Sequence, residues 1–158
     1  MDTPLKSRPA PGPPTTPEAR QRAAVLGSVT IHGRAEEVSG ARAFITRTLA
    51  ATGKGQRVDS DAATLLTSEL VTNAIVHTAS GSPDGSVTVV VVDVTDGVLI
   101  EVIDDGSPAG APVVRSHPMA QHGHGLYLVQ QLAAQWGFLR NPGGTTVWFH
   151  LAGDADDG

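Results

Sequence analysis

The chain has 158 residues, 40% of them hydrophobic and 4% aromatic, and carries a formal net charge of −5. This length suits one domain with a tail, and its core must be built mainly from Val, Leu, Ile and Ala. The absence of cysteine excludes disulfides and thiolate metal sites, and the negative charge argues against nucleic acid as the main partner.

The composition also bears on location. The longest apolar run, VTVVVVDV, is far too short to cross a membrane, and the N-terminus has no hydrophobic segment of the signal-peptide kind. We therefore expect a cytoplasmic protein without membrane contact.

Three regions are predicted along the chain. Residues 1–25 are rich in proline and poor in apolar residues, which is typical of a disordered tail. Residues 26–152 form the expected domain, and residues 153–158 form an acidic tail.

The domain is predicted to begin with a strand at 26–33. A helix follows over 35–53, where apolar residues recur at helical spacing and Gly53 is a plausible stop. A second helix begins near Asp59 or Ser60, both good N-caps, and runs to about His77.

The second half is predicted to begin with a hairpin. Two β-rich runs, 86–94 and 98–103, flank the two-residue turn Asp96-Gly97. A long Gly/Pro-rich loop at 104–122 leads to a third helix, GLYLVQQLAAQWG, with Gly137 as its C-cap, and to a final strand at 145–151. This order predicts an α+β two-layer sandwich, a mostly antiparallel sheet with helices on one face.

The stretch SELVTNAIVH, residues 68–77, puts polar residues on an apolar helix face. At 100° per residue, Glu69 and Asn73 fall within an arc that also contains Ala62, Leu65, Leu66, Leu70 and Val76. A buried carboxylate without a partner costs several kcal/mol. Amide and carboxylate oxygens suit Mg²⁺ with phosphate, and the acid could serve as a general base. The alternative is a helix end that approaches solvent.

Two further motifs suit a nucleotide. In VIDDGSPAG, Asp104 follows a predicted strand, where a carboxylate can accept a hydrogen bond from an exocyclic amine such as that of adenine, and Gly106 permits close backbone approach. In HGHGLYLV, Gly123 and Gly125 open a helix whose free N–H groups suit phosphate. The alternatives are an ordinary Asp-Gly turn and simple loop closure.

A metal site is the competing interpretation of the same loop. His117, His122 and His124 lie close together in the sequence, but without the regular ligand spacing of a zinc site. The histidines therefore suggest a histidine-rich metal-binding regulator as one hypothesis for the function.

The order of these motifs resembles a known family. ELVTNAIVH, DDGSP, GHGL and GGTTVWFHL, in this order over about residues 26–151, resemble the N, G1, G2 and G3 boxes of the GHKL ATPases. Within that superfamily the chain looks most like the small RsbW- and SpoIIAB-type anti-sigma factor serine kinases, particularly the stand-alone actinobacterial proteins. Their expected fold is the Bergerat-type ATP-binding sandwich.

The resemblance implies roles for single residues. Asn73 matches the asparagine that binds Mg²⁺ in the ATP complex, and Glu69 matches the acid proposed as general base towards a serine hydroxyl. The remaining matches bind the nucleotide itself, through adenine or phosphate: Asp104, Gly106, Gly123, His124, Gly125, Leu126 and Thr145. The chain departs from the pattern where Pro108 replaces the second G1 glycine and where His124 stands at a position that often carries Arg.

The resemblance also implies a function. The chain would bind ATP and Mg²⁺, phosphorylate a serine on a STAS-type anti-anti-sigma protein and sequester a sigma factor, and family members often form homodimers. The alternative is a nucleotide-dependent protein-binding module with little or no kinase activity.

Overall fold

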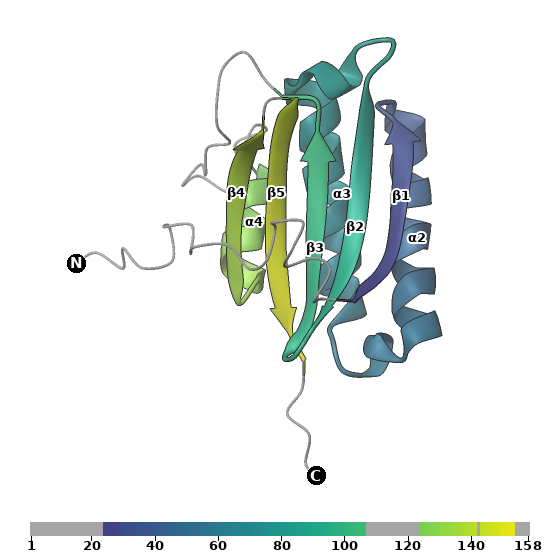
Figure 1. The fold of residues 1–158 in the computed structure, drawn as a ribbon, viewed down its shortest axis with the longest axis vertical. Coiled ribbons are helices and arrows are strands. Elements are labelled where there is room, and N and C mark those ends of the chain that lie inside the picture. The colour runs from purple at the N-terminus through teal and green to yellow at the C-terminus, as the bar shows by residue number, and fades with distance from the viewer. Residues whose placement is uncertain (1–23, 107–123, 142, 154–158) are drawn as a thin grey trace, which may run out of the picture.

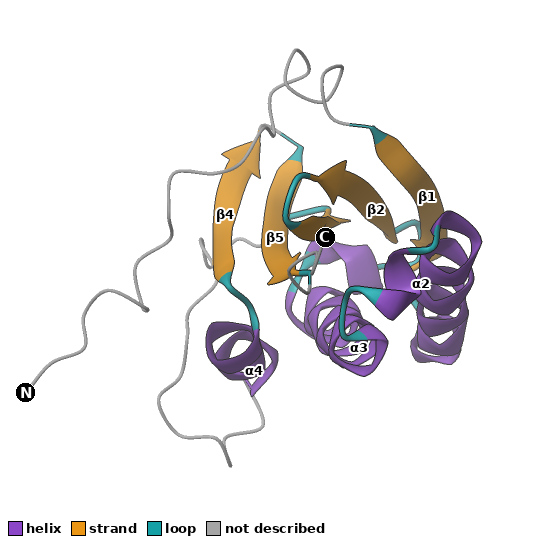
Figure 2. Ribbon diagram, turned by 90° about the horizontal axis from the view of Figure 1, so that it is seen from below, coloured by secondary structure: helices purple, strands orange, loops and turns teal. Residues whose placement is uncertain are grey.

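The computed structural model describes residues 24–106, 124–141 and 143–153. A five-stranded antiparallel sheet forms one layer, and helices cover one of its faces (Figures 1 and 2). The predicted α+β two-layer sandwich is confirmed.

The strands follow the order β1-β2-β3-β5-β4 across the sheet. Their bounds are β1 Val25–His32, β2 Ser86–Val94, β3 Gly97–Asp104, β4 Gln135–Asn141 and β5 Gly144–Ala152. The central strand β3 pairs with β2 and with β5. Each end of β3 therefore lies in the middle of one of the two edges of the sheet that are formed by strand ends.

In the described part of the chain, three α-helices form the second layer: α2 Val38–Thr52, α3 Ser60–His77 and α4 His124–Leu132. The chain also forms short 3₁₀ turns, η2 Ala35–Glu37, η3 Lys54–Gln56 and η4 Ala79–Gly81. Gly53 ends α2 with φ 76°, a left-handed conformation that favours glycine. The Asp59 side chain accepts a hydrogen bond from Ala62 N at 3.0 Å and caps α3, as the sequence predicted.

The main core lies between the sheet and the helices. Val87, Val89 and Val91 point from β2 into this layer and are fully buried. They alternate with Val90 and Val92, which belong to a smaller cluster on the opposite, helix-free face. Among the described residues no helix has the length and apolar character that a membrane crossing needs.

The third helix is shorter than predicted. It ends at Leu132, and Gln135–Asn141 forms strand β4, which the sequence analysis missed. Gly137 is therefore no C-cap; it pairs with Trp148, and a Cβ at this position would lie 2.6 Å from the Trp148 ring. Pairing with β5 and burial of Trp136 outweigh the local helical pattern, because tertiary contacts override propensity.

The hairpin between β2 and β3 is confirmed, but its turn is shifted by one residue. Val94 pairs with Gly97, so the two loop residues are Thr95 and Asp96. Gly97 opens β3 with φ 135°, and a Cβ there would collide with the Leu151 carbonyl.

Candidate nucleotide site

Several elements meet at the edge of the sheet where β3 ends, the upper edge in Figure 1. Asp104 is the last residue of β3 and pairs with Thr145 near the start of β5. The helix α3 also ends here, because the Ala79 N–H, two residues beyond it, donates to the Gly106 carbonyl at 2.8 Å. The sequence-predicted residues Asp104, Gly106 and Thr145 are thus brought together.

The carboxylate of Asp104 is held in a fixed orientation. Its Oδ1 accepts hydrogen bonds from Gly106 N at 2.7 Å and from Thr145 N at 3.3 Å. The residue is 7% exposed. Both hydrogen bonds go to Oδ1, and among the described residues none is found at Oδ2.

The surroundings of Asp104 oppose its ionisation. Burial raises the pKa of Asp104 above its ordinary value of 3.8, and the charge of Asp105 raises it further. The hydrogen bonds from Gly106 and Thr145 act in the opposite direction, because they stabilise the carboxylate. Burial outweighs the two hydrogen bonds, so the pKa of Asp104 stays raised. An additional hydrogen-bond donor would stabilise the charged carboxylate further.

Two glycines allow the chain to close around Asp104. Gly106 has φ 87°, and a Cβ on it would lie 3.2 Å from Gly144 Cα. A Cβ on Gly144 would lie 1.8 Å from the Asp104 carbonyl oxygen. Backbone therefore lies against backbone at the end of β3. Gly144 has no room for a side chain, and the positive φ of Gly106 disfavours any residue with a Cβ.

The turn after β3 is fastened to the segment that follows α3. Asp105 N donates to Ser80 Oγ at 2.9 Å, and Asp105 Oδ2 accepts from Ser86 N at 2.9 Å. Ser80 is fully buried. The sequence predicts only a loop for SGSPDGS, residues 80–86. The glycines of this loop are the one sequence signal of its close packing, since a Cβ on Gly85 would lie 2.1 Å from the Ser80 carbonyl oxygen.

The apolar face of α3 differs from the predicted one. The buried residues are Ala63, Leu66, Thr67, Leu70, Val71 and Ala74. Leu65 is 42% exposed and Val76 is 60% exposed, so the predicted arc was displaced towards solvent. The difference arises because the small residues Ala63 and Ala74 pack into the core, whereas Leu65 and Val76 point to solvent.

Glu69 and Asn73 consequently lie on the flank of α3, beside the buried face. Both are half-buried. The expected penalty for a fully buried Glu69 does not arise, because its side chain reaches solvent. Asn73 is four residues, about 6 Å along the axis, from His77, the end of α3 that is fastened to Gly106.

The first turn of α4 belongs to the same edge. The chain leaves α4 at Leu132 and enters β4, which runs from the Gln135–His150 pair to the Asn141–Gly144 pair near Asp104. The N-terminus of α4 is therefore directed towards the end of the sheet where Asp104 lies. His124, Gly125 and Leu126 form its first turn; Gly123, Pro108, His117 and His122 lie outside the described residues.

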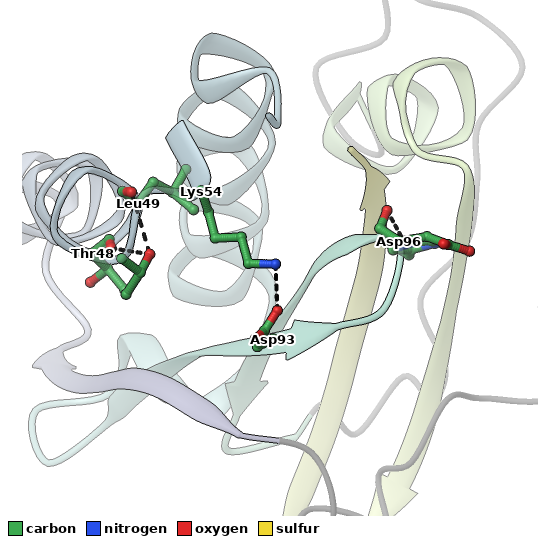
Figure 3. A network of polar contacts seen from close by, with 7 residues as sticks. Thr48, Leu49, Lys54, Asp93 and Asp96 are labelled. Atoms are coloured by element: carbon green, nitrogen blue, oxygen red, sulfur yellow. Dashed lines mark hydrogen bonds and ion pairs between the residues drawn. The ribbon is translucent and has the colours of Figure 1, made fainter. Parts of the chain in front are cut away.

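The opposite edge of the sheet contains a cavity of about 710 Å³, beside Asp96, Gly97 and His150. Figure 3 shows the nearby ion pair between Lys54 Nζ and Asp93 Oδ1, 2.6 Å apart, which ties η3 to β2. Gly97 and Asp104 are the two ends of β3, so this cavity lies at the opposite end of the strand from Asp104. Among the described residues no group of His, Asp and Glu is arranged to hold a metal ion.

The comparison with protein families decides the relationship. The model of the histidine kinase-like ATPase domain matches residues 31–151, which is most of the chain. The chain belongs to the histidine kinase-like ATPase domain family. A search of curated proteins found no match.

Family membership agrees with the geometry at the Asp104 edge. A histidine kinase-like ATPase domain binds ATP, and an oriented carboxylate beside a glycine-lined approach and a helix N-terminus fits an adenine nucleotide. The GHKL resemblance of the sequence is thereby confirmed at the level of the superfamily.

Proposed function

We propose that this ATPase domain binds Mg-ATP at the Asp104 edge, with Asp104 Oδ2 accepting a hydrogen bond from the adenine amine. The observation that carries this proposal is the pair of backbone hydrogen bonds to Oδ1, from Gly106 and Thr145. They fix the carboxylate and leave one oxygen for the ligand. A buried acceptor of this kind discriminates strongly in favour of a ligand that supplies a donor.

The other end of the nucleotide would lie towards α3 and α4. Asn73 and Glu69 are one helical turn apart on the half-buried flank of α3. We assign Asn73 as a ligand of Mg²⁺, which takes protein oxygen ligands together with phosphate oxygens. We assign Glu69 as the general base that accepts the proton of the attacking hydroxyl. The α4 N-terminus, with Gly123, His124, Gly125 and Leu126, would receive phosphate.

The reaction we propose is phosphorylation of a serine on a STAS-type anti-anti-sigma protein, by a kinase that also sequesters a sigma factor. The four motifs in register and their likeness to small anti-sigma factor kinases support this assignment. ATP would supply the phosphoryl group. The chain's own residues position the nucleotide and orient the hydroxyl, which is most of what phosphoryl transfer needs.

Transfer of labelled phosphate from ATP to purified STAS-domain proteins tests the proposal. Glu69→Gln is expected to slow transfer by about 10²–10⁴-fold while ATP affinity stays near the parent value, because only the proton acceptor is lost. Glu36→Gln, at an exposed position in η2, is the matched control and is expected to transfer at the parent rate.

The outcomes separate the candidate functions. Transfer that persists in Glu69→Gln overturns the role of Glu69 as a base. ATP binding without transfer to any STAS protein favours the nucleotide-dependent binding module instead.

A further inference from the structure

The side of α3 that is turned away from the sheet carries exposed apolar residues. The helix lies between α2 and α4 in the helix layer (Figure 2). Leu65 is 42% exposed and Val76 is 60% exposed, whereas Leu66 and Leu70 of the same helix are buried. The core of the sandwich therefore does not account for the apolar character of Leu65 and Val76.

These two residues lie on a strip of the helix that borders Glu69. At about 100° of rotation per residue, Leu65, Thr72 and Val76 fall within about 40° of one another. Thr72 is also exposed, and we call these three residues the outer strip of α3. Along the helix axis Leu65 is about 6 Å from Glu69 in one direction and Val76 is about 10 Å from it in the other. The outer strip thus extends past Glu69 on both sides.

The order of residues along α3 indicates where a phosphoacceptor would lie. Residues four apart are neighbours on a helix surface, so Glu69 has Asn73 on one side and Leu65 on the other. In the proposed function Asn73 binds Mg²⁺ and Glu69 accepts the proton of the attacking hydroxyl. In that arrangement the hydroxyl lies over Glu69, and the protein segment that carries it continues over Leu65, on the side away from the metal.

The exposed charges at the N-terminal end of α3 are acidic. Asp59, the N-cap, and Asp61, in the first turn, are both exposed, and the helix contains neither lysine nor arginine. Both aspartates also suit the positive end of the helix dipole, which is their structural role. Asp61 is the neighbour of Leu65 one turn towards the N-terminus, so its charge lies beside the outer strip. A partner with apolar and basic side chains would complement this surface in both respects.

We propose that the outer strip of α3 is the docking surface for the phosphoacceptor protein and that Leu65 positions its serine at Glu69. The acceptor would place an apolar side chain beside the serine, against Leu65, and a basic side chain farther along, against Asp61. Leu65 is about 6 Å and Asp61 about 12 Å along the helix from Glu69, which correspond to about two and about four residues of an extended segment. This docking role rests on the proposed function of Glu69 and specifies the surface that the serine protein must present.

Steady-state transfer of phosphate from ATP to a STAS-domain protein tests the role of Leu65. Leu65→Asp is expected to raise KM for the STAS protein about tenfold or more and to leave kcat and the Kd of ATP within about twofold, because the docking contact is the same before and during transfer. Leu65→Ala, which keeps a good helix former, is expected to raise this KM about threefold. Val25→Asp, at a valine of β1 that is 49% exposed, is the matched control and is expected to keep the parent KM.

The salt dependence of KM tests the charge. Asp61→Lys is expected to raise KM for the STAS protein about threefold at low ionic strength, and the ratio to the parent KM should fall towards one near about 1 M salt, where charges are screened within about 3 Å. Glu36→Lys, at an exposed position in η2, is the control and should change KM at neither salt concentration. A KM that ignores Asp61→Lys, or a ratio that does not depend on salt, overturns the basic side chain opposite Asp61.

The remaining outcomes each decide the docking proposal. Equal KM values for Leu65→Asp and a parent that transfers phosphate overturn the docking surface and leave the kinase function intact, as does an equal rise in Val25→Asp. A parent that transfers phosphate to no STAS protein overturns the kinase function and the docking surface together. Sedimentation velocity identifies a different occupant: a parent dimer that dissociates in Leu65→Asp while KM stays unchanged would place a second copy of the chain on the outer strip and overturn the proposal.

Discussion

At the scale of single residues, two opposing effects act on the charge of Asp104. Burial raises its pKa, whereas the N–H groups of Gly106 and Thr145 stabilise its charge. An ionised carboxylate in this position is held at a cost to stability, which is typical of a binding residue. Asparagine at this position removes the charge but keeps the hydrogen bonds, because its Oδ1 can still accept from both backbone N–H groups.

Asp104→Asn is expected to weaken ATP binding by about 1–3 kcal/mol, because an NH₂ group would face the adenine amine. Calorimetric titration with ATP measures the change. The neighbouring Asp105→Asn is the control; Asp105 is exposed and its Oδ2 accepts from Ser86 N. Equal affinities of Asp104→Asn and the parent would show that adenine binds elsewhere.

The same substitution has a pH-dependent effect on the nucleotide-free protein. The pKa of Asp104 is raised in the folded state, so its contribution to stability is fully present below the ordinary value of 3.8 and is lost as pH rises through the folded value. Asp104→Asn should therefore unfold at higher denaturant concentration than the parent near neutral pH, and the difference should shrink as pH falls towards 3.8. A difference that grows on acidification contradicts the raised pKa.

At the scale of elements, the site depends on the close approach of β3, β5 and the segment after α3. Gly144 opens β5 directly against the Asp104 carbonyl, and Ser80 joins that segment to Asp105. The end of α3 and the turn after β3 are thus one unit. A disturbance at either strand end is expected to alter the position of Asp104.

Gly144→Ala tests this contact, because its Cβ would lie 1.8 Å from the Asp104 carbonyl oxygen. We expect the free energy of unfolding to fall by about 1–3 kcal/mol and ATP affinity to fall with it. The neighbouring Gly143→Ala is the control, since its Cβ would meet nothing within 4 Å. Denaturant unfolding of both variants gives the comparison, and equal stabilities would rule out a tight strand junction.

At the scale of the whole molecule, ATP binding should couple the two halves of the sandwich. Asp104 and Thr145 belong to the sheet, whereas Asn73 and the N-terminus of α4 belong to the helix layer. A ligand that contacts both layers stabilises the folded state by mass action, by about 2.7 kcal/mol at a concentration one hundred times Kd.

We therefore expect Mg-ATP to raise the Tm, and Asn73→Ala to remove the part of this rise that depends on Mg²⁺. Thr72→Ala, at an exposed position on α3, is the control and should retain it. Thermal unfolding with ATP, with and without Mg²⁺, measures both. A Mg²⁺-dependent shift that survives in Asn73→Ala would remove this residue from the metal site.

The sequence by itself determined the fold class, the C-terminal end of α2, the limits of α3, and the match of four motifs to the GHKL ATPases. The helix predicted from residue 35 begins at Val38, after the 3₁₀ turn η2. These features depend on local patterns: helical spacing, the Asp59 cap, the left-handed Gly53 and the order of short motifs. Local patterns therefore sufficed for the superfamily and for most of the elements.

Only the tertiary structure decided β4, the turn residues Thr95 and Asp96, and the true inner face of α3. Each depends on partners distant in sequence: β5 for Gln135–Asn141, the β2–β3 register for the turn, and the sheet for Ala63 and Ala74. The same holds for Ser80, whose bond to Asp105 joins residues 25 positions apart. Periodicity records which side chains are apolar, but the packing of the sheet against the helices determines which of them become buried.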